Sequence, residues 1–102
     1  MGIQPSDKLH MSFRTREGYR HVKCDKIDVE GTGTGPKTFV CEGDQTWEAS
    51  EDSVQQIKIG RPGKIKVEHR NGTEIRERPI EFNSRNPDYM NMQDVRSLRP
   101  EE

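Results

Sequence analysis

The chain has 102 residues, of which 27% are hydrophobic and 34% are charged. This composition lies near the limit that supports a globular core, so we expect a single domain in which not every segment is packed. The 17 basic and 18 acidic residues give a formal net charge of −1, which excludes a general attraction to polyanions.

The N-terminal segment is polar and shows no periodicity, so residues 1–16 are predicted to form a flexible arm or a leader. It lacks the apolar core of a secretory signal, and no apolar stretch in the chain approaches the ~20 residues of a membrane span. We therefore expect a cytoplasmic protein without a membrane segment. The folded domain is predicted over residues 17–82, and residues 83–102 are predicted to form a polar tail.

A first strand is predicted over residues 19–30. Its apolar residues change phase between Cys24 and Ile27, which predicts a β-bulge near Asp25-Lys26. The segment Glu30-Gly-Thr-Gly-Thr-Gly-Pro36 is then predicted to form a flexible, glycine-rich loop. Two further strands are then predicted, over residues 37–42 and 45–49.

The two cysteines, Cys24 and Cys41, lie on the first two predicted strands. Antiparallel pairing with one extra residue at the bulge sets the cysteines opposite each other and also sets Ile27 opposite Phe39. We therefore predict neighbouring thiols that stay reduced in the cytosol, with a structural disulfide or a redox pair as the alternative. A metal site with His21 is not expected, because an odd spacing places His21 and Cys24 on opposite faces of a strand.

Residues 50–59 fit two interpretations. Ser50, followed by two acidic residues, is suited to cap one short helical turn before a brief strand. Alternatively, residues 54–59 form a full strand that leads into a turn over residues 60–63. We favour the short helical turn.

Residues 63–82 have alternating apolar and polar character on both sides of Asn71-Gly72, which predicts a β-hairpin. A three-residue loop with Gly72 in the left-handed conformation sets Val67 opposite Ile75, and we favour it because it pairs two apolar side chains. A two-residue loop would instead set Val67 opposite Arg76. Pro79 cannot donate a ladder hydrogen bond, so a bend or a sheet edge is expected there.

Five or six short strands joined by tight turns predict a mostly β fold, namely a small antiparallel barrel or curled sheet, with or without one short helix. In this architecture the chain resembles SH3-like barrels. Burial of its apolar side chains does not by itself offset the conformational entropy that the chain loses on folding. A protein partner or homodimerisation is therefore expected to bury further area.

Charge is unevenly distributed along the chain. Residues 42–52 carry five acidic and no basic residues, whereas residues 58–70 have a local charge of +4. On the predicted hairpin, basic side chains share one face, and with a neighbour in the preceding turn they form a candidate binding face: Lys64, Lys66, Arg76, Arg78 and Arg61. Such a face is able to contact phosphates. The alternative is an ordinary solvated surface, because Glu68 and Glu74 place acidic side chains among the basic ones. The acidic segment is able to cover the basic one within the molecule or on a second copy.

Two aromatic residues are candidate anchors for a protein partner. Trp47 is the only tryptophan, and the alternative, which we favour, is that it closes one end of the core. The segment Tyr89-Met90-Asn91-Met92 resembles the phosphotyrosine motif that docks SH2 domains. The alternative for this short segment is that Tyr89, Met90 and Met92 pack back on the domain or on a partner.

The sequence contains no nucleophile elbow and no phosphate-binding glycine loop followed by a lysine. We therefore expect no catalytic residues, no metal and no cofactor. The predicted function is that of a non-enzymatic binding or assembly module for protein–protein interaction or self-association. Weak nucleic-acid binding on the basic hairpin face is the alternative.

Overall fold

The computed structural model describes residues 8–31, 35–60, 63–83, 85–87 and 90–101. Within these ranges the chain consists almost entirely of strands and turns, and the strands form two antiparallel sheets. The fold is therefore mostly β, as predicted. The strands form two stacked sheets and do not close into a barrel within the described ranges, so of the two predicted forms, a barrel or a curled sheet, the barrel is wrong. Among the described residues there is no helix that could span a lipid bilayer.

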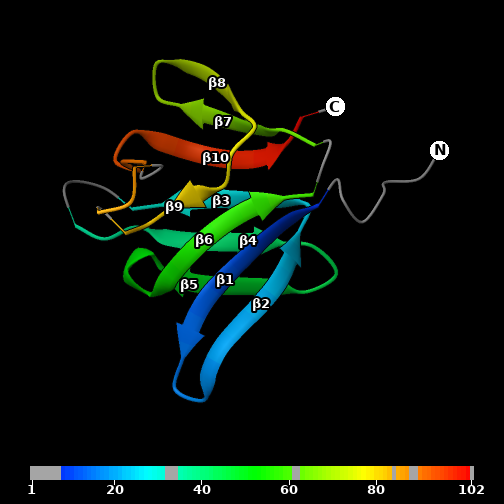
Figure 1. Ribbon diagram of the computed structural model, residues 1–102, viewed down its shortest axis with the longest axis vertical. Coiled ribbons are helices and arrows are strands. Elements are labelled where there is room, and N and C mark those ends of the chain that lie inside the picture. Colours follow the sequence, from blue (N-terminus) through cyan, green and yellow to red (C-terminus); the bar gives the residue numbers. More distant parts are fainter. Residues whose placement is uncertain (1–7, 32–34, 61–62, 84, 88–89, 102) are drawn as a thin grey trace.

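The smaller sheet has four strands in the order β2-β1-β6-β9, and the larger sheet has six in the order β5-β4-β3-β10-β7-β8. The strands of the smaller sheet are β1 (Leu9–Thr15), β2 (Gly18–Cys24), β6 (Val54–Ile59) and β9 (Ile80–Glu81). Those of the larger sheet are β3 (Lys26–Glu30), β4 (Thr38–Glu42), β5 (Thr46–Ser50), β7 (Ile65–His69), β8 (Gly72–Arg76) and β10 (Val95–Pro100). In Figure 1, β1, β2 and β6 cross diagonally over β4 and β5.

The chain changes sheet at Asp25, the single residue between β2 and β3. Cys24 pairs with Leu9 in the smaller sheet, whereas Lys26 pairs with Glu42 in the larger one. The predicted phase change is thus real, but it marks a corner between sheets instead of a bulge within one strand. Lys8 holds this corner with its ammonium group 3.0 Å from the Asp25 carboxylate, and the hydrogen bond to that carboxylate raises the pKa of Lys8.

A second change of sheet takes place around Pro79, between β8 and β9. β8 belongs to the larger sheet, while Ile80 pairs with Ile57 in the smaller sheet. β9 is the edge strand of that sheet. The predicted bend or edge position at Pro79 is therefore confirmed.

The predicted N-terminal arm and the predicted C-terminal tail each contain a central strand. β1 lies between β2 and β6, and its Leu9, Met11 and Phe13 are buried. β10 lies between β3 and β7, with Val95 and Leu98 buried. The prediction of an arm over residues 1–16 is thus wrong from the start of β1 onward, and the prediction of a polar tail over residues 83–102 is wrong for β10.

The hairpin of β7 and β8 has a register that differs from both predicted alternatives. It turns on Arg70-Asn71, so that Val67 pairs with Glu74. Among the described residues only Gly18 and Gly31 have positive φ, so Gly72 is not in the left-handed conformation. The favoured three-residue loop is therefore wrong.

The segment between β5 and β6 makes one 3₁₀ turn, η2 (Glu51–Ser53). Ser50 precedes it but makes no capping hydrogen bond with its side chain. β6 then runs for six residues and buries Val54 and Ile57. Both interpretations of this segment are thus partly realised, because a short turn leads directly into a full strand.

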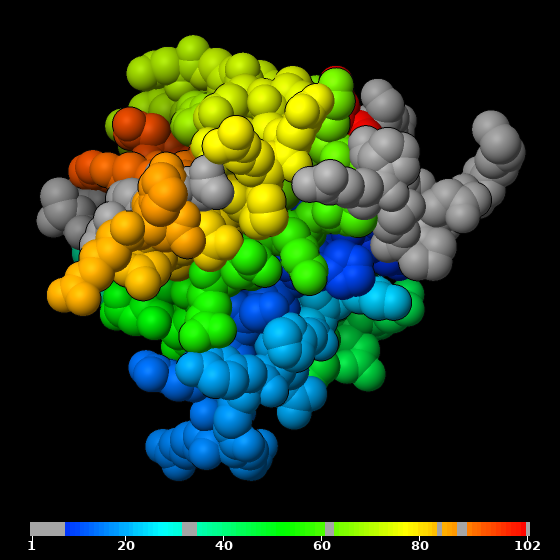
Figure 2. Space-filling view, in the orientation of Figure 1, coloured from blue at the N-terminus to red at the C-terminus, as the bar shows by residue number. Residues whose placement is uncertain are grey.

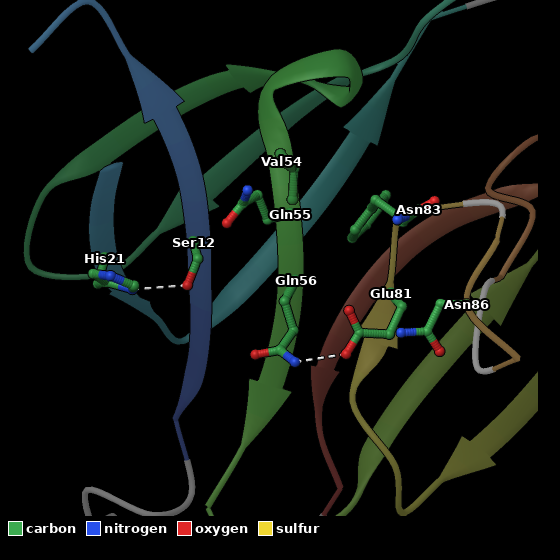
Figure 3. Close-up of a pocket in the computed structure, with 9 residues that line it drawn as sticks. Ser12, His21, Val54, Gln55, Gln56, Glu81, Asn83 and Asn86 are labelled. Atoms are coloured by element: carbon green, nitrogen blue, oxygen red, sulfur yellow. Dashed lines mark hydrogen bonds between the residues drawn. The ribbon is translucent and has the colours of Figure 1, made fainter. Parts of the chain in front are cut away.

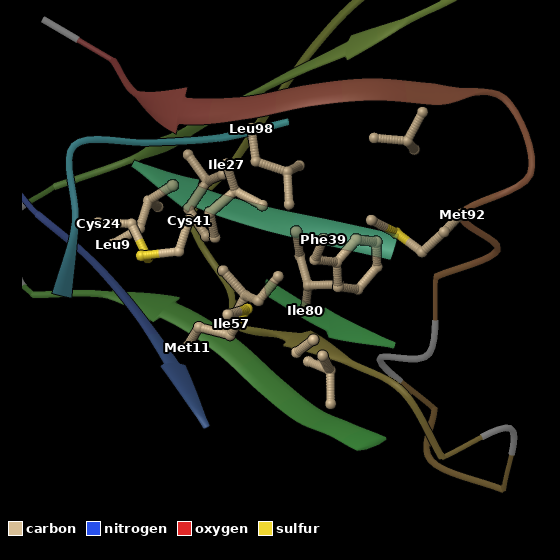
Figure 4. Close-up of a cluster of buried hydrophobic side chains, with 14 of the residues drawn as sticks. Leu9, Met11, Cys24, Ile27, Phe39, Cys41, Ile57, Ile80, Met92 and Leu98 are labelled. Carbon is tan, nitrogen blue, oxygen red and sulfur yellow. A yellow bond between two sulfur atoms is a disulfide. The ribbon is translucent and has the colours of Figure 1, made fainter. Parts of the chain in front are cut away.

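Cys24 and Cys41 are fully buried and joined by a disulfide, which Figure 4 shows within the core. The bond connects β2 of one sheet to β4 of the other. The prediction of reduced thiols is therefore wrong. The predicted pairing is also wrong, because Ile27 pairs with Cys41, and Phe39 pairs with Val29.

Trp47 closes the same side of the sandwich. It pairs with Cys41 and is partly buried against the core. The Arg20 guanidinium of β2 lies 4.7 Å from the centroid of its ring, a cation–π contact between the two sheets. The prediction that Trp47 closes one end of the core is confirmed.

Candidate functional site

The outer face of the smaller sheet carries a regular arrangement of polar side chains. Because Leu9, Met11 and Phe13 point into the core, the alternate residues of β1 point outward. Their paired neighbours complete three rows across the sheet, which we call the basic face: Lys23-His10-Lys58, His21-Ser12-Gln56-Glu81 and Tyr19-Arg14.

The middle row contains two hydrogen-bonded pairs, which Figure 3 shows side by side. The Ser12 hydroxyl and Nδ1 of His21 are 2.7 Å apart. Nε2 of Gln56 donates to the Glu81 carboxylate over 2.6 Å. Each pair joins neighbouring strands, so the four side chains are fixed relative to the sheet.

A cleft of about 490 Å³ lies along this row. Its opposite wall comes from residues that follow β9, namely Phe82, Asn83 and Asn86. This wall is held in place by backbone contacts, because the amide of Phe82 donates to the Gln55 carbonyl and the amide of Asn86 donates to the Asn83 carbonyl. The ring of Phe82 also packs on Phe39, with 5.3 Å between the ring centroids.

Positive charge surrounds the cleft but does not line it. Arg14, Lys23 and Lys58 are exposed, and none of them forms an ion pair with another described residue. Tyr19 pairs with Arg14 and is 58% exposed. Figure 2 shows the β1–β2 hairpin that carries both, in blue, projecting from the body of the molecule.

The outer face of the larger sheet has the opposite character, and we call it the acidic face. Its paired strand positions carry five carboxylates and three cations: Asp28, Glu30, Glu42, Glu48 and Glu68 against Lys26, Lys66 and Arg99. Arg96, which is exposed at the register shift of β10, adds a fourth cation to this sheet. The Lys26 ammonium lies 3.3 Å from the Asp28 carboxylate, and Arg99 forms an ion pair with Glu68. Within the described ranges, Glu30, Glu42 and Glu48 remain without an ion pair, so negative charge is concentrated at the β3–β5 side.

The predicted basic patch on the hairpin is divided by the observed register. Lys66 pairs with Ile75 and points outward, whereas Arg76 pairs with Ile65 and points toward the interior. Lys64 lies 3.5 Å from Glu77. Arg78 follows β8 in the bend before Pro79, and Arg61 lies outside the described residues. The prediction that the hairpin cations share one face is therefore wrong.

Of the two predicted anchors, Trp47 is described above and Tyr89 lies outside the described residues. Its neighbours Met90 and Met92 are buried in the core, as the packing alternative predicts. The residues of the basic face were not predicted as a site. The signal was present, because apolar and polar residues alternate from Leu9 to Arg14, which marks a strand with one exposed face.

The middle row combines a serine, a histidine and a carboxylate. Ser12 meets His21, but the Glu81 carboxylate bonds to Gln56 and not to the imidazole. The orienting contact of a serine–histidine–carboxylate triad is therefore not made by these residues. In the part of the chain that the structure describes, no group of three or more histidine, cysteine or acidic side chains is placed to hold a metal.

Comparison of the chain with known protein families, with curated proteins and with solved structures finds no match.

Proposed function

We propose that this chain is a non-enzymatic assembly module in which the basic face of one copy binds the acidic face of another. The observation that carries this proposal is that, among the described residues, unpaired cations lie on the smaller sheet, whereas unpaired carboxylates are concentrated on the β3–β5 side of the larger one. Arg14, Lys23 and Lys58 lie on the smaller sheet, whereas Glu42 and Glu48 lie on the larger one.

Two different faces make this contact heterologous. Each copy that binds through one face keeps the other face free, so assemblies grow beyond dimers unless the geometry closes a ring. A single exposed ion pair contributes only about 0.2–1 kcal/mol, so association requires several pairs at once. Salt screens such pairs, and assembly is therefore expected to weaken as ionic strength rises.

Light scattering tests this proposal. The mean mass is expected to increase with protein concentration at low salt and to fall toward the monomer at high salt. A Lys23→Glu, Lys58→Glu variant and a Glu42→Lys, Glu48→Lys variant should each fail to associate alone. Mixing them should restore association, because each then offers the charge that the other lacks. A wild-type protein that stays monomeric at low salt, or a mixture that stays monomeric, contradicts the proposal.

Nucleic-acid binding is a second candidate, and the exposed ring of Tyr19 beside Arg14 favours it. An aromatic ring among cations is suited to stack a base beside a phosphate contact. Fluorescence anisotropy with single-stranded DNA at low salt tests this candidate. A Tyr19→Ala, Arg14→Ala variant should bind several-fold more weakly than a Lys66→Ala control, since Lys66 lies on the other sheet. Equal binding by both variants contradicts it.

The disulfide bears on the compartment in which the protein works. Disulfides persist in oxidising environments, while cytosolic glutathione and thioredoxin keep thiols reduced. We therefore propose an oxidising compartment in place of the cytoplasmic location expected from the sequence.

A further inference from the structure

We infer that the cleft beside the middle row binds a neutral, polyhydroxylated ligand, namely a segment of an oligosaccharide. The inference concerns a different part of the smaller sheet from the charges that carry the proposed assembly. It depends on the chemistry of the side chains that line the cleft.

Most of the polar lining consists of groups that both donate and accept hydrogen bonds, and the Glu81 carboxylate adds an acceptor. Ser12 supplies a hydroxyl, and Gln56, Asn83 and Asn86 supply carboxamides. A sugar hydroxyl has the same dual character, so adjacent hydroxyls of one ring match such groups in either direction. Neither lysine nor arginine lines the cleft, which argues against a phosphate or a sulfate as the group bound there.

The apolar side of the cleft depends on Phe82, whose aromatic ring is partly buried against the core. Val54 also lines the cleft, but it is only 4% exposed and offers little surface. A pyranose ring combines polar edges with an apolar C–H face, and that face is suited to pack on an aromatic ring. A ligand with polar groups alone would leave this surface in contact with water.

The cleft is largely preorganised. Ser12 is held by His21, Gln56 is held by Glu81, and the amide of Arg85 donates to the Asn83 side chain over 3.0 Å. Side chains fixed in this way lose little conformational freedom when a ligand binds. The volume of about 490 Å³ lies within the range of about 300–1,000 Å³ that is typical of small-molecule sites.

The test is binding of the full chain to immobilised neutral oligomers of glucose, xylose, mannose and N-acetylglucosamine, with calorimetry on those that bind. At least one oligomer is expected to bind, with an affinity that does not change as salt is raised. Gln56→Ala and Ser12→Ala should each weaken binding about three- to tenfold, as expected for a lost hydrogen bond. The matched control is Gln45→Ala, because Gln45 is an exposed glutamine in the turn before β5.

Three outcomes overturn the inference: no neutral oligomer binds, only acidic polysaccharides bind, or Gln56→Ala and Ser12→Ala both bind as well as Gln45→Ala. Thermal unfolding of each variant separates a lost contact from a lost fold. The Lys23→Glu, Lys58→Glu variant should keep sugar binding while it loses assembly. Loss of assembly and loss of sugar binding are therefore measured independently, and the failure of one prediction does not decide the other.

Discussion

At the scale of single residues, the register of one hairpin decides which side chains the core receives. In the observed pairing Ile75 lies opposite Lys66 and is 43% exposed. Arg76 takes the inward position, where its side chain is only 19% exposed and its guanidinium lies 3.5 Å from the Glu74 carboxylate. Nε of Arg76 is buried without a hydrogen-bond partner in the structure. This strand thus exposes an isoleucine and partly buries an arginine.

A matched pair of substitutions tests that register. Ile65 is fully buried, so Ile65→Ala should lower the free energy of unfolding by about 2–5 kcal/mol. Ile75→Ala should lower it by less than about 1 kcal/mol, because much of the side chain is already in contact with water. Urea denaturation followed by circular dichroism measures both values. Equal losses would mean that Ile75 is buried, as the three-residue loop requires.

At the scale of elements, local alternation predicts strands more reliably than it predicts their partners. β4 and β5 agree with the predictions over residues 37–42 and 45–49 to within one residue at each end. Their residues alternate cleanly between a buried and an exposed side. Pairing is a different matter, because β1 pairs with β6 and β10 pairs with both β3 and β7. Contacts between residues so far apart in the chain cannot be detected from the pattern of a short sequence window.

The two missed strands differ in the signal that they carry. β1 alternates from Leu9 to Phe13, so its period was visible although its polar residues suggested an arm. In β10 a register shift between Val95 and Ser97 breaks the period of two, and Leu98 follows with the opposite phase. A search for strict alternation of apolar and polar residues does not detect a strand with such a bulge. The candidate site was missed for the same reason as β1, because Ser12 and its row lie on that strand.

Corners between sheets leave a local signal that is easily misinterpreted. At Asp25 and at Pro79 the apolar phase shifts, and at both points the chain passes from one sheet to the other. A bulge and a corner produce the same shift in sequence. Only the long-range pairing distinguishes them, because the flanking strands then belong to different sheets.

At the scale of the whole molecule, the stacking of the two sheets separates the core from two different outer faces. The inner faces form the core, whereas in the described part of the chain unpaired cations lie on the outer face of the smaller sheet and unpaired carboxylates lie on the β3–β5 side of the larger one. One side of the stack is fastened by the Cys24–Cys41 disulfide and by the contact between Arg20 and Trp47. Because both connections link β2 with β4 or β5, they set how the basic face is oriented relative to the acidic face.

Removing the disulfide should therefore weaken the molecule as a whole. The cysteines are 17 residues apart, and for a loop of about that length the chain-entropy model gives a stabilisation of about 3 kcal/mol. A Cys24→Ala, Cys41→Ala variant should unfold at correspondingly lower urea and at lower temperature than the oxidised wild type. Added reductant should destabilise the wild type to a similar extent, given access to the buried bond, and should leave the variant unchanged. Two free thiols in wild-type protein that is unfolded without reductant would contradict the disulfide. If reductant does not shift the unfolding curve of the wild type, the disulfide does not contribute to stability.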